Sequence, residues 1–248
     1  MSDKGYKVEK VLPYKKKKEG KEEQVKEMFN SISGHYDAMN RAMTMGIDVT
    51  WRRRAIKSLR KYKPKLILDV ATGTADFAIE ACQRLRPLKI IGIDISEKML
   101  ENGRIKVAKQ GLSNVIELKK DNCLQCSYDD ASFDAVTVAF GLRNFENLEK
   151  GIKEMYRVLK PGGSLVILEL SEPNFLFLPL YRIYTKLIIP FMACSLRQDV
   201  KAYQYLPTTI QYFPKGKEMI ALLQKCGFKE VKYRRFTFGV CSFYRALK

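Results

Sequence analysis

Short apolar runs alternate with amphipathic segments over most of the chain. Five runs rich in Val, Ile and Leu are predicted to be strands, at residues 65–71, 88–95, 114–121, 133–141 and 163–171. The segments between them repeat apolar residues at helical spacing, over 75–85, 96–111 and 147–160. Strands that alternate with helices predict a parallel sheet with helices on both faces.

The C-terminal part departs from this rhythm. Residues 216–227 have a helical pattern, and residues 228–248 read as two strands with no helix between them. Such a pair predicts a hairpin at one end of the sheet, so one strand should be antiparallel. The expected fold is a Rossmann-like α/β domain with a mostly parallel, seven-stranded sheet.

The N-terminal part is predicted to be helical. Within residues 22–62, Val25, Met28, Phe29 and Ile32 follow the spacing of one helical face. Residues 1–21 contain eight lysines and only three acids, which is typical of a flexible basic arm. We therefore expect an arm over 1–21 and a single domain over 22–248.

Charge and composition narrow the class of partner. The net charge of +18 indicates an anionic partner, which could be nucleic acid, an anionic membrane surface or an acidic ligand. Six cysteines are scattered along the chain, with one Cys-x-x-Cys pair and one histidine, so we expect reduced thiols and no metal site. The apolar stretch 175–196 is interrupted by charges and prolines, and its charge-free parts are too short to span a membrane.

Polar residues follow three of the predicted strands. A turn of small residues around Gly73 follows the first strand, Asp94 ends the second, and Asp121 and Asn122 end the third. In such sheets ligands bind beyond the carboxyl ends of the strands. Asp94 is placed to accept hydrogen bonds from ribose hydroxyls, and the pair after the third strand to bind the edge of an adenine. Each acid taken alone could simply cap the next helix.

The turn does not suit a dinucleotide. Two glycines of the dinucleotide-binding pattern are alanine, and Asp69 and Asp76 add negative charge close to the turn. Negative charge disfavours a pyrophosphate and favours a cationic adenosine ligand such as S-adenosylmethionine. The expected cofactor is therefore S-adenosylmethionine, and a nicotinamide-dependent oxidoreductase is the weaker reading.

Several segments carry a family resemblance. The segments "ILDVATGTAD", "GIDIS" and "FGLRNFENLEKGIKEMYRVLKPGG" resemble class I S-adenosylmethionine-dependent methyltransferases. Together with "YDAMN", "YQYLPTTIQYFP" and "FTFGVCS", they are similar to the UbiE-type C-methyltransferases of menaquinone and ubiquinone biosynthesis, from about residue 25 to the C-terminus. The resemblance implies that the cofactor is bound by the following residues: Gly73, Thr74, Asp94, Asp121 and Asn122.

The resemblance also implies the reaction. The expected substrate is a prenylated quinol, most simply demethylmenaquinol, with a benzoquinol of ubiquinone synthesis as the alternative. Arg143 and Asn144 of "FGLRN" are implied to line the quinol pocket and to assist its deprotonation through water. Two departures from the family pattern are Ala139, where serine is common, and Thr208-Thr209, where Glu-Ser is common.

Four further residues are candidates for contact with the quinol ring. Tyr36, Tyr203 and Tyr205 could touch the ring or simply pack in the core. His35 is a candidate base because histidine titrates near neutral pH, although a packing or surface role suits it as well.

A substrate with a lipid tail would explain the basic charge, because such a substrate lies in a membrane with anionic headgroups. Residues 172–213 are predicted to be a lid that accepts the isoprenoid tail, although the stretch could equally be core or a dimer contact. The lysine arm, Arg52–Arg54 and 232–235 are candidates for contact with anionic headgroups, so we expect a cytoplasmic protein held at the inner face of the membrane. No nucleic acid is expected, since "FGLRN" stands where RNA methyltransferases carry their catalytic motif.

Overall fold

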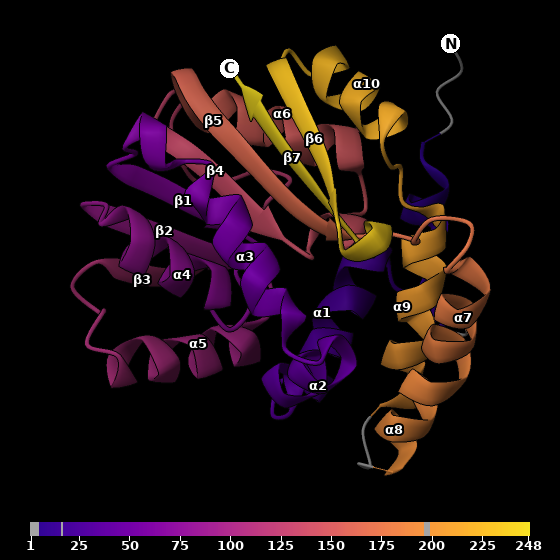
Figure 1. The fold of residues 1–248 in the computed structure, drawn as a ribbon. Helices are drawn as coiled ribbons and strands as arrows, with labels where there is room; N and C mark the ends of the chain where they lie inside the picture. The colour runs from indigo at the N-terminus through magenta and orange to yellow at the C-terminus, as the bar shows by residue number, and fades with distance from the viewer. Residues whose placement is uncertain (1–4, 16, 196–198) are drawn as a thin grey trace.

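The computed structural model describes residues 5–15, 17–195 and 199–248. Their strands form one seven-stranded sheet in the order β3-β2-β1-β4-β5-β7-β6 (Figure 1). The strands are β1 (Leu66–Val70), β2 (Lys89–Asp94), β3 (Ile116–Lys120), β4 (Phe133–Ala139), β5 (Leu159–Leu170), β6 (Lys229–Phe236) and β7 (Cys241–Leu247). Only β7 runs antiparallel to its neighbours, β5 and β6. The predicted sheet and its one reversed strand are confirmed.

Helices cover both faces of the sheet. One face packs against α3 (Ile47–Lys57), α4 (Asp76–Leu85) and α5 (Glu97–Lys109), and the other against α6 (Leu148–Val158) and α10 (Lys217–Lys225). Each central strand supplies both cores, because successive side chains point to opposite faces: Ile67 joins the first core and Leu68 the second.

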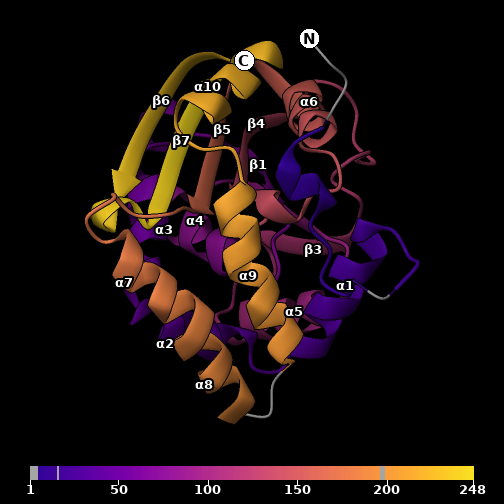
Figure 2. The ribbon, with the colours of Figure 1, turned by 90° about the vertical axis from the view of Figure 1, so that its right-hand side faces the viewer.

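A third helical layer lies beyond the carboxyl ends of the parallel strands. It consists of α1 (Lys21–Ile32), α2 (Tyr36–Thr44), α7 (Leu178–Ile183), a π-helical segment (Tyr184–Ile188), α8 (Ile189–Ser195) and α9 (Val200–Tyr212). Figure 2 shows α7 and α8 as one rod beside α9, in front of the strand ends. Buried side chains of α1, α2, α8 and α9 form a separate apolar cluster here. The 172–213 segment therefore folds mainly as a helical hairpin over the end of the sheet.

Part of the N-terminal segment packs on the domain. Residues 7–10 form a short 3-10 helix, and Val8 is fully buried. The ammonium group of Lys21 is buried as well, and it donates to the carbonyl oxygens of Val8 (2.7 Å) and Arg143 (3.2 Å). Glu9 accepts the N–H of Leu148. These contacts join residues 7–10 and Lys21 to the domain, whereas the prediction of a flexible arm rested on lysine-rich composition alone.

Candidate active site

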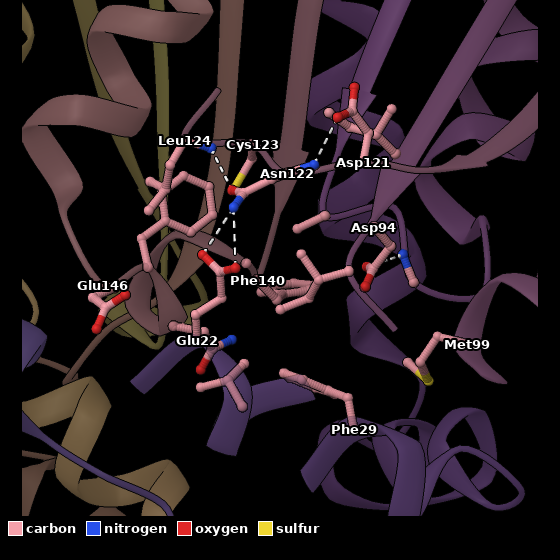
Figure 3. Close-up of a pocket in the computed structure, with 18 of the residues that line it drawn as sticks. Glu22, Phe29, Asp94, Met99, Asp121, Asn122, Cys123, Leu124, Phe140 and Glu146 are labelled. Carbon is pink, nitrogen blue, oxygen red and sulfur yellow. Dashed lines mark hydrogen bonds between the residues drawn. The ribbon is translucent and has the colours of Figure 1, made fainter. Parts of the chain in front are cut away.

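The first cavity lies at the carboxyl ends of β1, β2, β3 and β4, and α1 covers it (Figure 3). It has a volume of about 690 Å3 including its open mouth. The described residues that line it include four acids and no lysine or arginine: Glu22, Asp94, Asp121 and Glu146. In a chain of net charge +18, an acidic cavity of this kind disfavours phosphate ligands and favours a cation.

The carboxylate of Asp94 is held by two backbone N–H groups and can still accept further hydrogen bonds. Its two oxygens accept the backbone N–H groups of Gly73 (2.9 Å) and Ser96 (2.9 Å). Burial raises the pKa of this carboxyl, and the two N–H groups act against the rise. Each carboxylate oxygen keeps a second lone pair, so Asp94 can still accept bonds from the two hydroxyls of a ribose.

Asp121 and Asn122, in the loop after β3, both line the first cavity and also bond to other groups of the protein. The carboxylate of Asp121 accepts the N–H groups of Asn122 and Ser127, so it shapes its own loop while the residue lines the cavity. The amide of Asn122 donates to both carboxylate oxygens of Glu22 at 3.0 Å and accepts the N–H of Leu124. Glu22 comes from α1, 100 positions away, and no local pattern marks it as a site residue.

The two predicted residues of the first turn have separate roles. Gly73 has a φ of +56°, which a side chain would strain, and it lines the first cavity. The hydroxyl of Thr74 donates to Asp37 of α2 and accepts from Lys106 of α5. Thr74 therefore ties the turn to α2, and it lines a smaller neighbouring cavity instead of the first one.

A second cavity lies between α2, α3 and the hairpin α7–α9. Its volume is about 980 Å3, open mouth included. Its wall is largely apolar, with Trp51, Leu170, Ile189, Leu206 and Ile210 among the lining residues. Tyr36 and Phe140 line both cavities, so the two spaces meet at these rings. Burial raises the pKa of Tyr36, and the nearby positive charges of Arg143 and Arg52 oppose this rise. Tyr36 therefore stays protonated at neutral pH.

The "FGLRN" loop separates the two cavities. Arg143 lines the second cavity, and its Nη1 donates to Glu169 Oε1 at 2.6 Å and to the carbonyl of Phe140. Arg143 and Glu169 are both buried, and the Arg143 Nε has no partner among the described residues. Asn144 lines the first cavity, and within the described structure its Oδ1 also lacks a partner. The loop thus presents one polar group to each cavity.

Three candidates lie away from the cavities. Tyr203 and Tyr205 line neither space: both are buried in the apolar cluster of α1, α2, α8 and α9, and their hydroxyls have no partner among the described residues. Their positions on α9 turn both side chains into this cluster, so contact with the substrate stays a prediction. His35 is exposed at the start of α2 and lines neither space.

Sequence reasoning missed several residues of the second cavity. Trp51 and Arg52 come from α3, and Tyr181, Tyr184 and Leu206 come from the helical hairpin.

Among the described residues, no three His, Cys, Asp or Glu side chains cluster as a metal site would require.

The first cavity fits S-adenosylmethionine. Asp94 offers acceptors for a ribose, the Asn122 loop offers polar groups for a base, and the acidic wall suits a sulfonium. A doubly covered, mostly parallel sheet with an adenosine site at its strand ends, next to a separate apolar cavity, defines a class I S-adenosylmethionine-dependent methyltransferase.

Comparison with known proteins agrees with this class. Residues 17–248 match the model of the ubiE/COQ5 methyltransferase family, and the chain belongs to that family. The demethylmenaquinone methyltransferase of Bacteroides fragilis is 50% identical over 245 residues, covering 98% of this chain and 99% of that protein. The enzyme of the same name from Porphyromonas gingivalis is 44% identical, covering 97% and 98%. A solved methyltransferase of Thermotoga maritima shares the fold, with a TM-score of 0.64 at 19% identity over 90% of this chain and 99% of that one.

Proposed function

We propose that this methyltransferase adds a methyl group to a ring carbon of a prenylated quinol, and that the quinol is demethylmenaquinol. The junction of the two cavities carries the proposal: an apolar space with a buried arginine opens onto the cofactor space at Tyr36 and Phe140. The relatives named demethylmenaquinone methyltransferase support the choice of ring.

Methyl transfer to carbon needs an electron-rich ring, and S-adenosylmethionine supplies an electrophilic methyl group when bound. Loss of a phenolic proton to water pushes charge onto the ortho carbon. That carbon takes the methyl group, and its own hydrogen then leaves as a proton that returns the ring oxygen to a phenol, so one proton is released overall. Arg143 lines the second cavity, so its guanidinium would stabilise the phenolate oxygen as it develops. Glu169 holds that guanidinium in place, which avoids reorientation during the reaction.

Aromatic side chains exclude water from the meeting point of the cavities. Tyr36 of α2 packs edge-to-face on Phe29, with ring centroids 6.0 Å apart. Phe140 lies 6.4 Å from Trp51 in the same arrangement. These rings would align a flat quinol against the cofactor and keep solvent from the carbanion-like carbon.

The rod α7–α8 and the turn before it would hold the isoprenoid tail. The rod lines the second cavity through Tyr181, Tyr184, Thr185 and Ile189. Large apolar residues of the rod and of the preceding turn are exposed and form an outer strip: Phe175, Leu176, Leu180, Ile183, Leu187 and Ile188. An exposed apolar strip of this extent is typical of a membrane or partner contact.

We further propose that this outer strip dips into the lipid layer at the inner face of the membrane. Lys186 and Lys201 are exposed on the hairpin and would add roughly 1 kcal/mol each on an anionic surface. No helix among the described residues is long and apolar enough to cross a bilayer. The tail would then enter the second cavity directly from the lipid. A second copy of the chain is the other occupant that the strip would suit.

The reaction is tested with labelled S-adenosylmethionine and vesicles that contain reduced demethylmenaquinone or the matching benzoquinol. Label in menaquinone is expected. Label only in the benzoquinone would move the assignment to ubiquinone synthesis. Absence of label from both, with cofactor binding intact, would refute a quinol substrate and direct attention to nucleic acid.

Membrane contact is tested by co-sedimentation with phosphatidylglycerol vesicles. Leu180→Glu should lower the bound fraction several-fold, because it places a charge in the apolar strip. Leu88→Glu is the matched control, since both leucines are 69% exposed and Leu88 lies on the sheet domain. Equal binding of the two variants would contradict the proposed surface, and concentration-dependent dimerisation that is lost only in Leu180→Glu would reassign it to a second copy.

A further inference from the structure

A third, smaller cavity extends the first one past the turn after β1. Its volume is about 330 Å3, open mouth included. It shares Ala71, Gly73 and Ala139 with the first cavity and Arg52 with the second, while Tyr36 lines all three. If the ribose of the cofactor lies at Asp94, the third cavity is the space next to that sugar, on the far side of the turn, where the methionine part could lie.

The charges of this cavity have both signs. Asp69 and Asp76 supply two carboxylates, and Arg52 is the single basic residue among the described residues that line it. Burial raises the pKa of Asp69 to about 6, so it is mostly ionised at neutral pH. A small space with one cation and two anions matches an amino acid, which carries a carboxylate and an ammonium.

Arg52 has an unused edge. Its side chain is buried, and its Nη1 pairs with Asp48 one turn earlier on α3. Its Nη2 lies 3.8 Å from Asp76 Oδ2, which is beyond hydrogen-bond distance, and its Nε has no partner within the described structure. Nε and Nη2 form the side edge of a guanidinium, the edge that receives a carboxylate with two parallel hydrogen bonds.

We propose that Arg52 binds the carboxylate of the methionine part of S-adenosylmethionine. A buried guanidinium with an unpaired N–H is costly, and a carboxylate in the third cavity would satisfy it. Asp69 would then be the carboxylate left for the methionine ammonium, because Asp76 already pairs with Lys106 Nζ at 2.7 Å. The run Arg52–Arg54 was expected to face anionic headgroups, but its first member is an interior residue, and only Arg53 and Arg54 are exposed.

The test compares two ligands by calorimetry on the protein without a methyl acceptor. One ligand is S-adenosylmethionine, and the other is its decarboxylated form, which lacks only the carboxylate. The wild type should bind the intact ligand about 10- to 100-fold more tightly, the range expected for hydrogen bonds between charged groups. In Arg52→Gln this preference should shrink to within about 3-fold, and affinity for the decarboxylated ligand should stay the same.

Arg41→Lys is the matched control. Arg41 pairs with the same two acids, Asp48 and Asp76, but lines none of the three cavities. Its variant should keep the wild-type preference. If Arg52→Gln does not fold, Arg52→Lys is measured in its place. Lysine keeps a positive charge for Asp48 but cannot form two parallel hydrogen bonds to a carboxylate, so the preference for the intact ligand should fall at least about 3-fold.

A preference that survives in a folded Arg52→Gln protein would overturn the proposal, as would equal weakening of both ligands. An unchanged preference for the intact over the decarboxylated ligand in the Arg52→Lys protein would also overturn it. The inference concerns the cofactor alone, so its failure is distinguishable from failure of the quinol assignment, which the vesicle assay measures separately.

Discussion

The buried pair between Arg143 and Glu169 offers the most direct test of how the site is held. Glu169 is fully buried, and its carboxylate accepts three donors: Arg143 Nη1 at 2.6 Å, the Arg143 N–H at 3.2 Å and the Leu170 N–H at 2.9 Å. Glu169→Gln keeps the volume and one oxygen. It removes the charge and turns an NH2 group toward one of these donors.

The size of the effect follows from that arrangement. Loss of one partner from a buried ion pair costs about 3–5 kcal/mol, and the retained amide oxygen places this variant near the lower end, at about 3 kcal/mol. A domain is stable by about 5–15 kcal/mol, so the variant should still fold. Its urea midpoint should fall by about 1 M or more.

The chain contains a natural reporter for this measurement. Trp51 is its single tryptophan, is buried, and donates from Nε1 to Thr237 Oγ1 at 2.8 Å. Its fluorescence should therefore follow unfolding and the state of the second cavity. Glu117→Gln is the control, because Glu117 forms surface pairs with Lys89 and Lys119 and should change stability by less than about 1 kcal/mol.

Activity should change selectively. A loosened Arg143 should lower kcat/KM for the quinol by about 100-fold, while the Kd for S-adenosylmethionine stays within a few-fold, because Arg143 lines only the second cavity. Stability and quinol kinetics both equal to those of the wild type would refute the view that this pair positions the guanidinium. The double variant with Arg143→Met should cost less than the sum of the two single changes.

Three further outcomes follow from the structure. Gly103→Ala should weaken cofactor binding and destabilise the protein by about 1–3 kcal/mol. Its added methyl group would lie 2.7 Å from the Leu118 side chain and 3.3 Å from the carbonyl oxygen of Gly73. Gly34→Ala is the control in calorimetry, because Gly34 has open space around it. Asp69 has a folded pKa of about 6, above its usual 3.8, so its stabilising effect relative to Asp69→Asn is present at low pH and is lost as the pH rises through 6. The difference in unfolding free energy between these two proteins should fall by about 1 kcal/mol from pH 5 to pH 7, and a constant difference would contradict the shift. Burial lowers the pKa of Lys21 to about 8 from 10.5, so the unfolded chain binds more protons above neutrality. The wild type should therefore gain about 1 kcal/mol relative to Lys21→Met between pH 7 and pH 9, in urea titrations at each pH.

The sheet and the rim of the cofactor site could be predicted because their signals are local. Alternating apolar runs mark strands and helices within a few residues, and acids directly after strands must meet at one edge of a parallel sheet. The carboxylate of Asp94 is an example, since its position at the end of β2 places it beside the turn at Gly73.

The partners of buried polar groups could not be predicted in the same way. Glu22 meets Asn122, 100 positions away, and the buried ammonium of Lys21 donates to the carbonyl of Arg143, 122 positions away. A charged side chain is buried only where a distant group satisfies it, and its neighbours in sequence do not reveal that group. The contacts of Lys21 with Val8 and Arg143 were hidden for the same reason.

The sequence by itself determined the layered sheet, the cofactor edge and the family, because periodicity and short motifs are properties of adjacent residues. Only the tertiary structure decided which of these polar residues face a cavity. It joined α1, α2 and the α7–α9 hairpin over the strand ends and so divided the space into three connected cavities around Tyr36. The physical reason is that burial and pairing free energies depend on contacts between segments far apart in the chain, which the order of residues does not display.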